Sequence, residues 1–186
     1  MESRSKQSMD KLVQGNAAFV AATHNPADIS PARRTETAVN GQKPFAVILG
    51  CADSRTAPEH IFSAGIGELF VVRTAGNVVG NFVIASVEFA VKQFSVPLVV
   101  VMGHTGCGAV AAALGDGADG YVGLVVQEVR DSLNGATAEN DALRNNVLHC
   151  KKRILQSTEI SSLIDAGQVE IACALYDIRT GRVEFF

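Results

Sequence analysis

Phe-Ala-Val-Ile-Leu-Gly-Cys-Ala-Asp-Ser-Arg, at residues 45–55, joins an apolar, β-branched run to a cysteine, an aspartate and an arginine. We predict a buried strand at Phe45–Leu49, with the reactive side chains just beyond its C-terminal end. A second apolar run at Leu98–Met102 leads in the same way into Gly-His-Thr-Gly-Cys-Gly at residues 103–108. Active sites of open α/β sheets lie outside the C-terminal ends of the strands. The two stretches therefore predict a functional site at one edge of a parallel sheet.

Cys51, His104 and Cys107 are the metal-ligand types that these two stretches supply. Thiolate and imidazole suit zinc better than harder ions. A catalytic zinc site commonly takes three protein ligands and leaves the fourth position to water, whereas a structural site takes four. The three glycines of the second stretch let the backbone turn tightly enough to aim both of its ligands at one point. These residues therefore predict a catalytic zinc site.

Asp53 and Arg55 follow Cys51 at alternate positions, which in an extended segment places all three side chains on one face. The fixed positive charge of a guanidinium keeps a neighbouring carboxylate ionised by lowering its pKa. Asp53 is then an acceptor that orients a water at the metal, or it becomes the fourth ligand and displaces that water. An ordinary ion pair on a surface turn is the simpler alternative.

Other sites that use cysteine or glycine fit these stretches poorly. A phosphatase cradle wants five residues between cysteine and arginine, and here Cys51 and Arg55 enclose three. The glycines at 103, 106 and 108 are in the wrong order for a dinucleotide fingerprint. No Cys-x-x-Cys pair is present for thioredoxin-like chemistry.

Length and composition fit one domain spanning residues 1–186. The net charge of −3 argues against a nucleic-acid or anionic-membrane partner. No apolar run approaches the roughly 18 residues of a membrane span, and no secretory signal is visible, so we expect a cytoplasmic protein. In such a reducing compartment the four cysteines favour metal binding over disulfides.

Periodicity predicts alternating strands and helices. The predicted strands are Phe45–Leu49, Leu69–Arg73, Leu98–Met102, Val169–Tyr176 and Val183–Phe186. The predicted helices are Ser8–Ala22, Ser30–Val39, Ala57–Phe62, Asn81–Phe94, Cys107–Leu114, Val122–Leu133, Ala138–Gln156 and Ile160–Asp165. This order predicts a three-layer α/β fold with a mainly parallel central sheet and an antiparallel edge strand. The helix at 81–94 is apolar on more than one side and is predicted to be a buried crossover. Residues 1–40 form a helical arm that packs either on a partner subunit or on its own chain.

From Gln42 to Phe186 the sequence resembles the β-class carbonic anhydrases. Four stretches carry the resemblance: Cys-Ala-Asp-Ser-Arg at 51–55, Phe-Val-Val-Arg-Thr-Ala-Gly-Asn at 70–77, Gly-His-Thr-Gly-Cys-Gly-Ala at 103–109 and Ala-Leu-Tyr-Asp at 174–177. The resemblance implies a zinc lyase that reversibly hydrates carbon dioxide to bicarbonate and a proton. It also implies zinc on the two cysteines and the histidine named above, with the aspartate and arginine as a catalytic dyad.

The resemblance further implies a substrate site and an assembly. Gln42 and a backbone N–H at Gly108 are expected to steady bicarbonate oxygens, and Phe70, Ala75 and Phe89 to line an apolar carbon dioxide pocket. Some relatives have valine at the position of Ala75 and tyrosine at that of Phe89. The expected assembly is a homodimer or a dimer of dimers, with the cleft at the subunit boundary.

Two other functions stay open at this point. One is hydrolysis of carbonyl sulfide or carbon disulfide, which are linear isosteres of carbon dioxide. The other is a non-catalytic relative that binds zinc or an anion, although an intact Asp53 and Arg55 argue against it.

Overall fold

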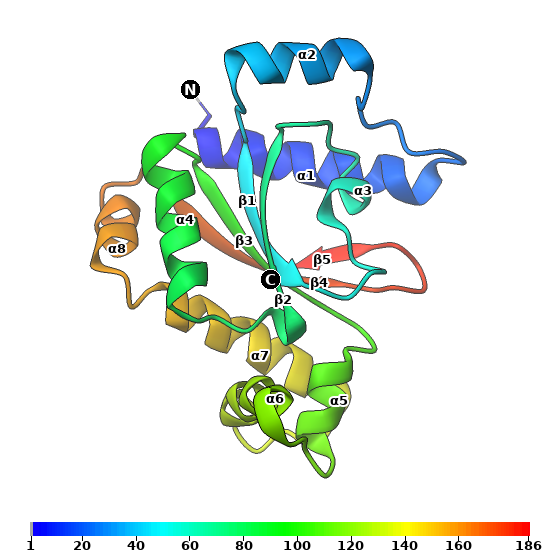
Figure 1. Cartoon of the computed structure of the whole chain (residues 1–186), viewed down its shortest axis with the longest axis vertical. Coiled ribbons are helices and arrows are strands. Elements are labelled where there is room, and N and C mark those ends of the chain that lie inside the picture. Colours follow the sequence, from blue (N-terminus) through cyan, green and yellow to red (C-terminus); the bar gives the residue numbers. More distant parts are fainter. Residues whose placement is uncertain (1) are drawn as a thin grey trace.

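The computed structural model, which describes residues 2–186, places five strands in one sheet in the order β2-β1-β3-β4-β5 (Figure 1). Their bounds are β1 Ala46–Cys51, β2 Leu69–Thr74, β3 Leu98–His104, β4 Glu170–Tyr176 and β5 Val183–Phe185. The first four strands pair in parallel, and β5 is antiparallel to β4 at the edge. The predicted sheet is confirmed. β1 and β3 run two residues further than predicted, because parallel neighbours continue the ladders to Cys51 and His104.

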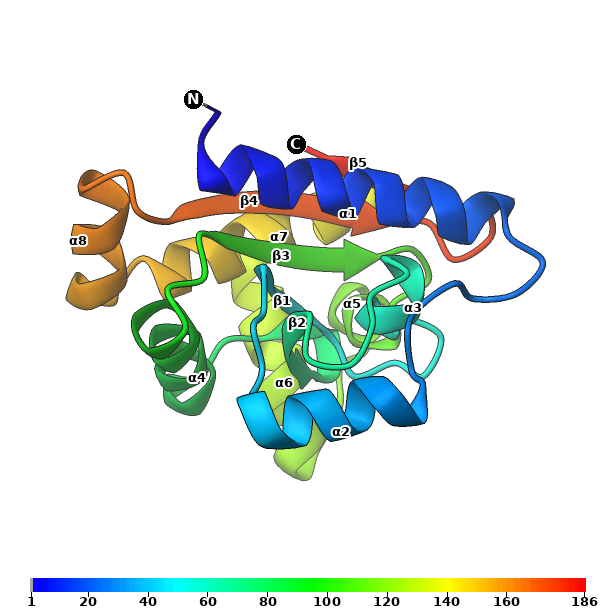
Figure 2. The same cartoon turned by 90° about the horizontal axis from the view of Figure 1, so that it is seen from above.

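Helices cover both faces of this sheet and give the three layers that the sequence predicts (Figure 2). The elements are α1 Arg4–Ala21, α2 Pro31–Asn40, α3 Pro58–Ile61, η1 Ala75–Asn77, α4 Asn81–Gln93, α5 Gly108–Leu114, α6 Gly120–Ser132, α7 Glu139–Ile154 and α8 Thr158–Asp165. α1 begins four residues before the predicted start, because Ser3 caps it by accepting a hydrogen bond from the Lys6 N–H. The short 3₁₀ turn η1 was not predicted.

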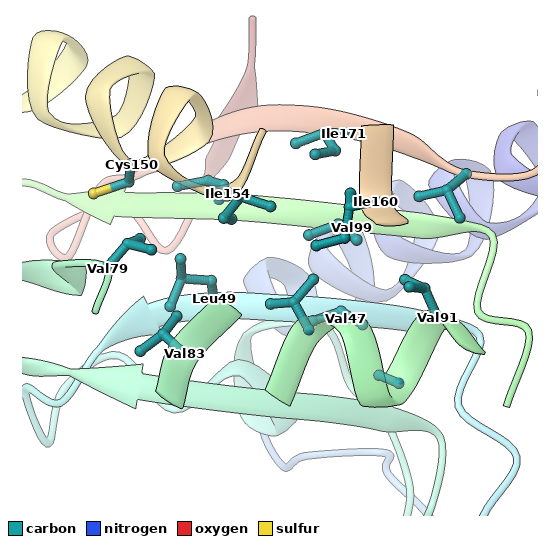
Figure 3. Packing of buried hydrophobic residues seen from close by; sticks show 14 of the residues in the cluster. Val47, Leu49, Val79, Val83, Val91, Val99, Cys150, Ile154, Ile160 and Ile171 are labelled. Carbon is teal, nitrogen blue, oxygen red and sulfur yellow. The ribbon is translucent and has the colours of Figure 1, made fainter. Parts of the chain in front are cut away.

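Alternate side chains of the central strands pack against different helical layers. Val47 and Leu49 of β1 join the cluster formed with α4, α7 and α8 (Figure 3). Ala46 and Ile48 point to the opposite face, where α1 and α3 lie. All four are fully buried, as expected for parallel strands covered on both sides. Because both faces are packed, each strand is held in one position along its axis, and this determines which residue lies at the C-terminal edge of the sheet.

α1 packs on its own chain, which is one of the two arrangements predicted for the arm, and a contact with a partner subunit stays a prediction. It lies alongside β3 and β4 (Figure 2), and Leu12 is fully buried in the core. The amide of Asn16 donates to the carbonyls of Ile61 and Gly181 at 3.2 and 2.8 Å, and its oxygen accepts the Val183 N–H at 2.9 Å. Helix α2, by contrast, buries no residue.

α4 differs from its prediction as a fully buried crossover. Val83, Val87, Ala90 and Val91 form one buried face against the sheet. Its other side leaves Phe82 91% exposed and Phe89 50% exposed. The apolar residues on more than one side of this helix are therefore divided between the core and an exposed surface.

No helix within residues 2–186 has both the length and the apolarity required to cross a membrane. The four cysteines are all buried, and none of them forms a disulfide in the described residues.

The contact between α1 and α3 yields a test of where α1 packs. A methyl group at Gly15 would overlap the carbonyl oxygen of Phe62. Alanine normally stabilises a helix by about 1 kcal/mol relative to glycine, but here we expect Gly15→Ala to lower the free energy of unfolding by about 1–3 kcal/mol. Gln14→Ala, at an exposed neighbouring position, should change it by less than about 0.5 kcal/mol. Urea unfolding measures both, and a Gly15→Ala protein as stable as wild type would place α1 away from α3.

Candidate metal centre

Three buried side chains converge where β1 and β3 end. The ligand atoms of Cys51, His104 and Cys107 all lie within 4.8 Å of one another. Cys51 and His104 are the last residues of two adjacent parallel strands. Cys107 follows a turn in which Gly106 has φ +67°, a left-handed conformation that favours glycine, and it forms the N-cap of α5. The structure thus brings together the three predicted ligands.

The imidazole of His104 has one ring nitrogen available for a metal. Nδ1 lies 3.0 Å from the carbonyl oxygen of Thr105, to which it donates. Nε2 is buried and, among the described residues, has no hydrogen-bond partner. Burial by itself lowers the pKa of His104, but interaction with the Cys51 sulfur outweighs it and raises that pKa. The site therefore favours a positive charge at this nitrogen, and a bound metal ion would supply one.

The groups around the Cys51 sulfur favour its anionic form. A hydrogen bond from the Cys107 thiol, aided by His104, lowers the pKa of Cys51 to about 3, and the same contact raises the pKa of Cys107. The backbone N–H groups of Gly76 and Asp53 also donate to this sulfur, at 3.3 and 3.5 Å. Sulfur ligands bind metals as thiolates. The soft donor set, with one thiolate already favoured and one nitrogen lone pair unused, fits zinc.

Asp53 and Arg55 form a bidentate ion pair beside these residues. Arg55 Nε and Nη2 lie 2.9 and 2.6 Å from the two Asp53 carboxylate oxygens. The Arg55 backbone N–H also donates to Asp53 Oδ1 at 2.9 Å, so the pair is made by an Asx turn and not by the extended segment we predicted. Hydrogen bonding from Arg55 holds the pKa of Asp53 well below its usual value. The carboxylate is thus ionised and turned toward the guanidinium.

Arg73 supports the same segment, a role that the sequence reasoning missed. Its Nε donates to the Cys51 carbonyl at 2.8 Å and its Nη2 to the Asp53 carbonyl at 2.6 Å. The hydroxyl of Thr56, which is buried, donates to the same two carbonyls at 3.2 and 2.9 Å. The sequence did contain a signal for this role, because Arg73 is the last residue of the predicted strand at 69–73, which neighbours the strand that leads to Cys51.

Glu139, at the start of α7, holds the loop between His104 and Cys107 through a hydrogen bond. Its Oε1 accepts the Gly106 N–H at 2.8 Å, and the Gly106 carbonyl accepts Arg55 Nη2 at 3.2 Å. This chain of contacts ties the loop between His104 and Cys107 to the ion pair. Nothing in the local sequence marks Glu139 for this role.

Two of the expected substrate residues lie close to the ligands. Ala75 follows Thr74, which is paired with Cys51 in the sheet. Gly108 is the first residue of α5, and a methyl group added there would meet no atom within 4 Å. Open space therefore lies in front of the backbone next to Cys107.

The structure does not bring Gln42, Phe70 and Phe89 to the ligands of the same chain. Phe70 pairs with Val47, four residues before Cys51 and therefore about 13 Å along the strand. The Phe70 and Phe89 ring centroids are 6.3 Å apart, and both rings lie near that of Phe94. Gln42 precedes β1 and lines a pocket of about 440 Å³ that Phe94 also lines. These residues gather toward the opposite end of the sheet.

Comparisons with known proteins agree on one family. The family model described as carbonic anhydrase matches residues 46–183. Carbonic anhydrase 2 of Mycobacterium tuberculosis is 42% identical over 182 residues, covering 92% of this chain and 87% of that protein. The crystal structure of the β-carbonic anhydrase CafA of Aspergillus fumigatus has a TM-score of 0.74 at 26% identity, over 83% of this chain and 81% of that chain. One of two β-carbonic anhydrases of Sordaria macrospora described as tetrameric has a TM-score of 0.73 at 23% identity, over 97% and 94%.

The bond from Gly106 to Glu139 predicts a remote effect on metal binding. Glu139→Ala leaves the Gly106 N–H without its acceptor, and we expect zinc affinity to fall about tenfold, as for other groups that position ligands. Glu139→Gln retains an amide oxygen and should bind zinc nearly as wild type does, as should Asn140→Ala at the exposed next position. Competition with a chromogenic chelator measures the affinities. Equal affinities for Glu139→Ala and wild type would remove this bracing role.

Proposed function

Because this chain belongs to the β-class carbonic anhydrase family, we propose that it catalyses the zinc-dependent, reversible hydration of carbon dioxide to bicarbonate and a proton. The observation that carries the proposal is the buried group of Cys51, His104 and Cys107 beside an ionised Asp53. It supplies three donor atoms for a metal and one ionised hydrogen-bond acceptor at the same edge of the sheet. That combination suits hydration chemistry better than a purely structural metal site.

Cys51, His104 and Cys107 would hold the zinc. When bound, zinc supplies a Lewis acid that lowers the pKa of a coordinated water from 15.7 to about 7. The chain keeps its donors ready, since His104 Nδ1 is tied to a backbone carbonyl and leaves Nε2 free for the metal. The buried setting excludes bulk water from the thiolate side of the site.

Asp53 is proposed to accept a hydrogen bond from the attacking water or hydroxide and so to fix its orientation. Arg55 engages both carboxylate oxygens, which keeps Asp53 ionised and turned toward the guanidinium. Release of that contact would let Asp53 become a fourth metal ligand, which would compete with water for the open position. Arg55 is therefore proposed to hold Asp53 as an acceptor.

The rest of the substrate site is proposed to combine two chains. Ala75 and the Gly108 N–H of one chain lie beside its own metal ligands, whereas Gln42, Phe70 and Phe89 of that chain lie toward the other end of the sheet. In a two-fold dimer the same patch of each subunit faces its copy. The partner's glutamine would then steady bicarbonate oxygens, and its two phenylalanines would line the apolar pocket for carbon dioxide.

A homodimer or a dimer of dimers is the assembly that this site needs. The half-exposed Phe89 and the exposed Phe82 of α4 give the chain an apolar surface for such a contact. The tetrameric Sordaria macrospora structures, which share the fold, are compatible with a dimer of dimers. The free thiols fit a reducing compartment, and we propose a cytoplasmic location.

The proposed chemistry is tested by separating metal binding from turnover. Purified protein should carry about one zinc per chain, Cys107→Ser should lose most of it, and Cys173→Ser, a buried free thiol in β4, should keep both zinc and activity. Asp53→Asn should retain zinc but lose about 10²-fold in kcat, because the carboxylate that accepts the hydrogen bond from the attacking water or hydroxide is gone.

Elemental analysis and stopped-flow carbon dioxide hydration provide these measurements, and the same protein is assayed with carbonyl sulfide and carbon disulfide. Faster turnover of either sulfur gas would favour the hydrolase. Stoichiometric zinc without turnover of any of the three gases would favour a non-catalytic relative.

Subunit mixing tests the shared site. Gln42→Ala keeps the metal ligands, Cys107→Ser keeps Gln42, and each should be nearly inactive alone. When the two are unfolded together and refolded at equal amounts, half of the dimers are hybrids with one complete site, so activity should recover to about a quarter of wild type. If Gln42 served its own chain, no hybrid would contain a complete site. Hybrids verified by mass spectrometry that show no recovery would contradict the shared cleft.

A further inference from the structure

Two buried polar side chains of α7 reach the turn that follows β2. Asn146 and Cys150 are four residues apart and so share one face of the helix. The Asn146 amide Nδ2 donates to the Gly76 carbonyl at 2.9 Å. The Cys150 thiol donates to the Asn77 carbonyl at 3.2 Å and accepts from the Asn77 side-chain amide at 3.4 Å. Three hydrogen bonds thus join one helix face to two consecutive residues of η1.

The turn that these bonds hold has an unusual backbone. Gly76 and Asn77 have φ of +61° and +49°, so both lie in the left-handed region. After glycine, asparagine is among the residues that adopt this conformation most readily, so the sequence of the turn suits its backbone. A methyl group at Gly76 would come 2.8 Å from the Cβ of Ala109 in α5. The turn is therefore pressed closely against the helix that begins just after Cys107.

Cys150 is suited to this contact as a neutral thiol. Its side chain is fully buried, and burial raises its pKa to about 12. The proton therefore stays on sulfur at neutral pH and is available for the Asn77 carbonyl. Cys150 is not a member of the metal-binding group, so its role is distinct from that of the other sulfur atoms near the site.

The turn also contacts one of the proposed metal ligands, Cys51. The Gly76 N–H donates to Cys51 Sγ at 3.3 Å, while the Gly76 carbonyl, on the far side of the residue, is the group that Asn146 holds. The two groups belong to neighbouring peptide units, so holding the carbonyl limits rotation of the backbone at Gly76 and helps to keep its N–H directed at the sulfur. A hydrogen bond to a thiolate sulfur withdraws electron density from it, and groups of this kind tune the metal that the sulfur binds.

We propose that Asn146 and Cys150 are positioning residues of the metal centre, which clamp the Gly76–Asn77 turn so that the Gly76 N–H donates to the Cys51 sulfur. This inference rests on the proposed function, because it needs a metal on Cys51. It gives a reason for two buried polar side chains. Apolar side chains of similar volume would fill the same space but could not hydrogen-bond to the turn.

Cobalt(II)-substituted protein provides a readout that a merely structural role would not change. Loss of an N–H donor raises the energy of the sulfur lone pair, so Asn146→Leu should shift the thiolate-to-cobalt charge-transfer band to longer wavelength and weaken zinc binding about tenfold. Ile154→Ala, a fully buried site on the same helix whose side chain makes no hydrogen bond to the turn, should lower the melting temperature but leave the band in place.

A second pair of variants keeps the test decisive if Asn146→Leu does not fold. Cys150→Ala removes the contacts to Asn77 and should shift the band in the same direction, whereas Cys150→Ser retains a donor and an acceptor and should restore the wild-type position. Folded variants at both positions with unshifted bands would overturn the inference. A wild-type protein without any thiolate-to-cobalt band would instead show that the proposed metal centre itself is wrong.

Discussion

The parallel pairing of β1 with β3 is the constraint on which the site depends. These strands lie next to each other in the middle of the sheet and are buried on both faces, so neither can slide without moving side chains of two helical layers. Their last residues are Cys51 and His104. The cost of misplacing either ligand is therefore the cost of disrupting the core, which is far larger than any single contact at the edge. The reactive atoms are placed by packing, and only their final orientation is left to local hydrogen bonds.

Those local bonds share a common purpose, which is to stabilise charge at the sheet edge, where Cys51 is buried and Asp53 is partly exposed. The Cys51 thiolate accepts backbone N–H groups and lies beside the imidazole, and the Asp53 carboxylate has a guanidinium on both oxygens. Arg73 and Glu139 then tie the backbone of both stretches together. A buried charge is costly unless it is paired and hydrogen-bonded. The binding of a cation among these groups would complete the pairing, which makes the site electrostatically ready for a metal.

The sheet and the candidate ligands could be predicted from the sequence because short, continuous stretches of residues specify both. Unbroken apolar runs mark strands buried on two faces, and the residues directly after them must lie at the sheet edge. The ion pair of Asp53 and Arg55 was also foreseen, although a turn makes it. Glu139, Asn146 and Cys150 were not foreseen in their present roles, because their partners are 33 to 73 residues away. Such contacts follow from how α7 crosses the sheet, and no local pattern encodes that. The packing of α1 on its own chain was left open for the same reason.

The candidate ligands and most of the expected substrate residues lie at opposite ends of the sheet. The candidate metal ligands and the Asp53–Arg55 pair lie at the C-terminal ends of the strands, whereas Phe70, Phe89 and Gln42 gather near the N-terminal ends. Phe70 pairs with Val47, about 13 Å along the sheet from Cys51, which is too far for one chain to join the two groups around a molecule as small as carbon dioxide. The proposed dimer would remove the difficulty, because each of its two copies would present its aromatic end to the other's metal end. The exposed phenylalanines of α4, a liability on an isolated chain, would then be the surface that completes a neighbour's site.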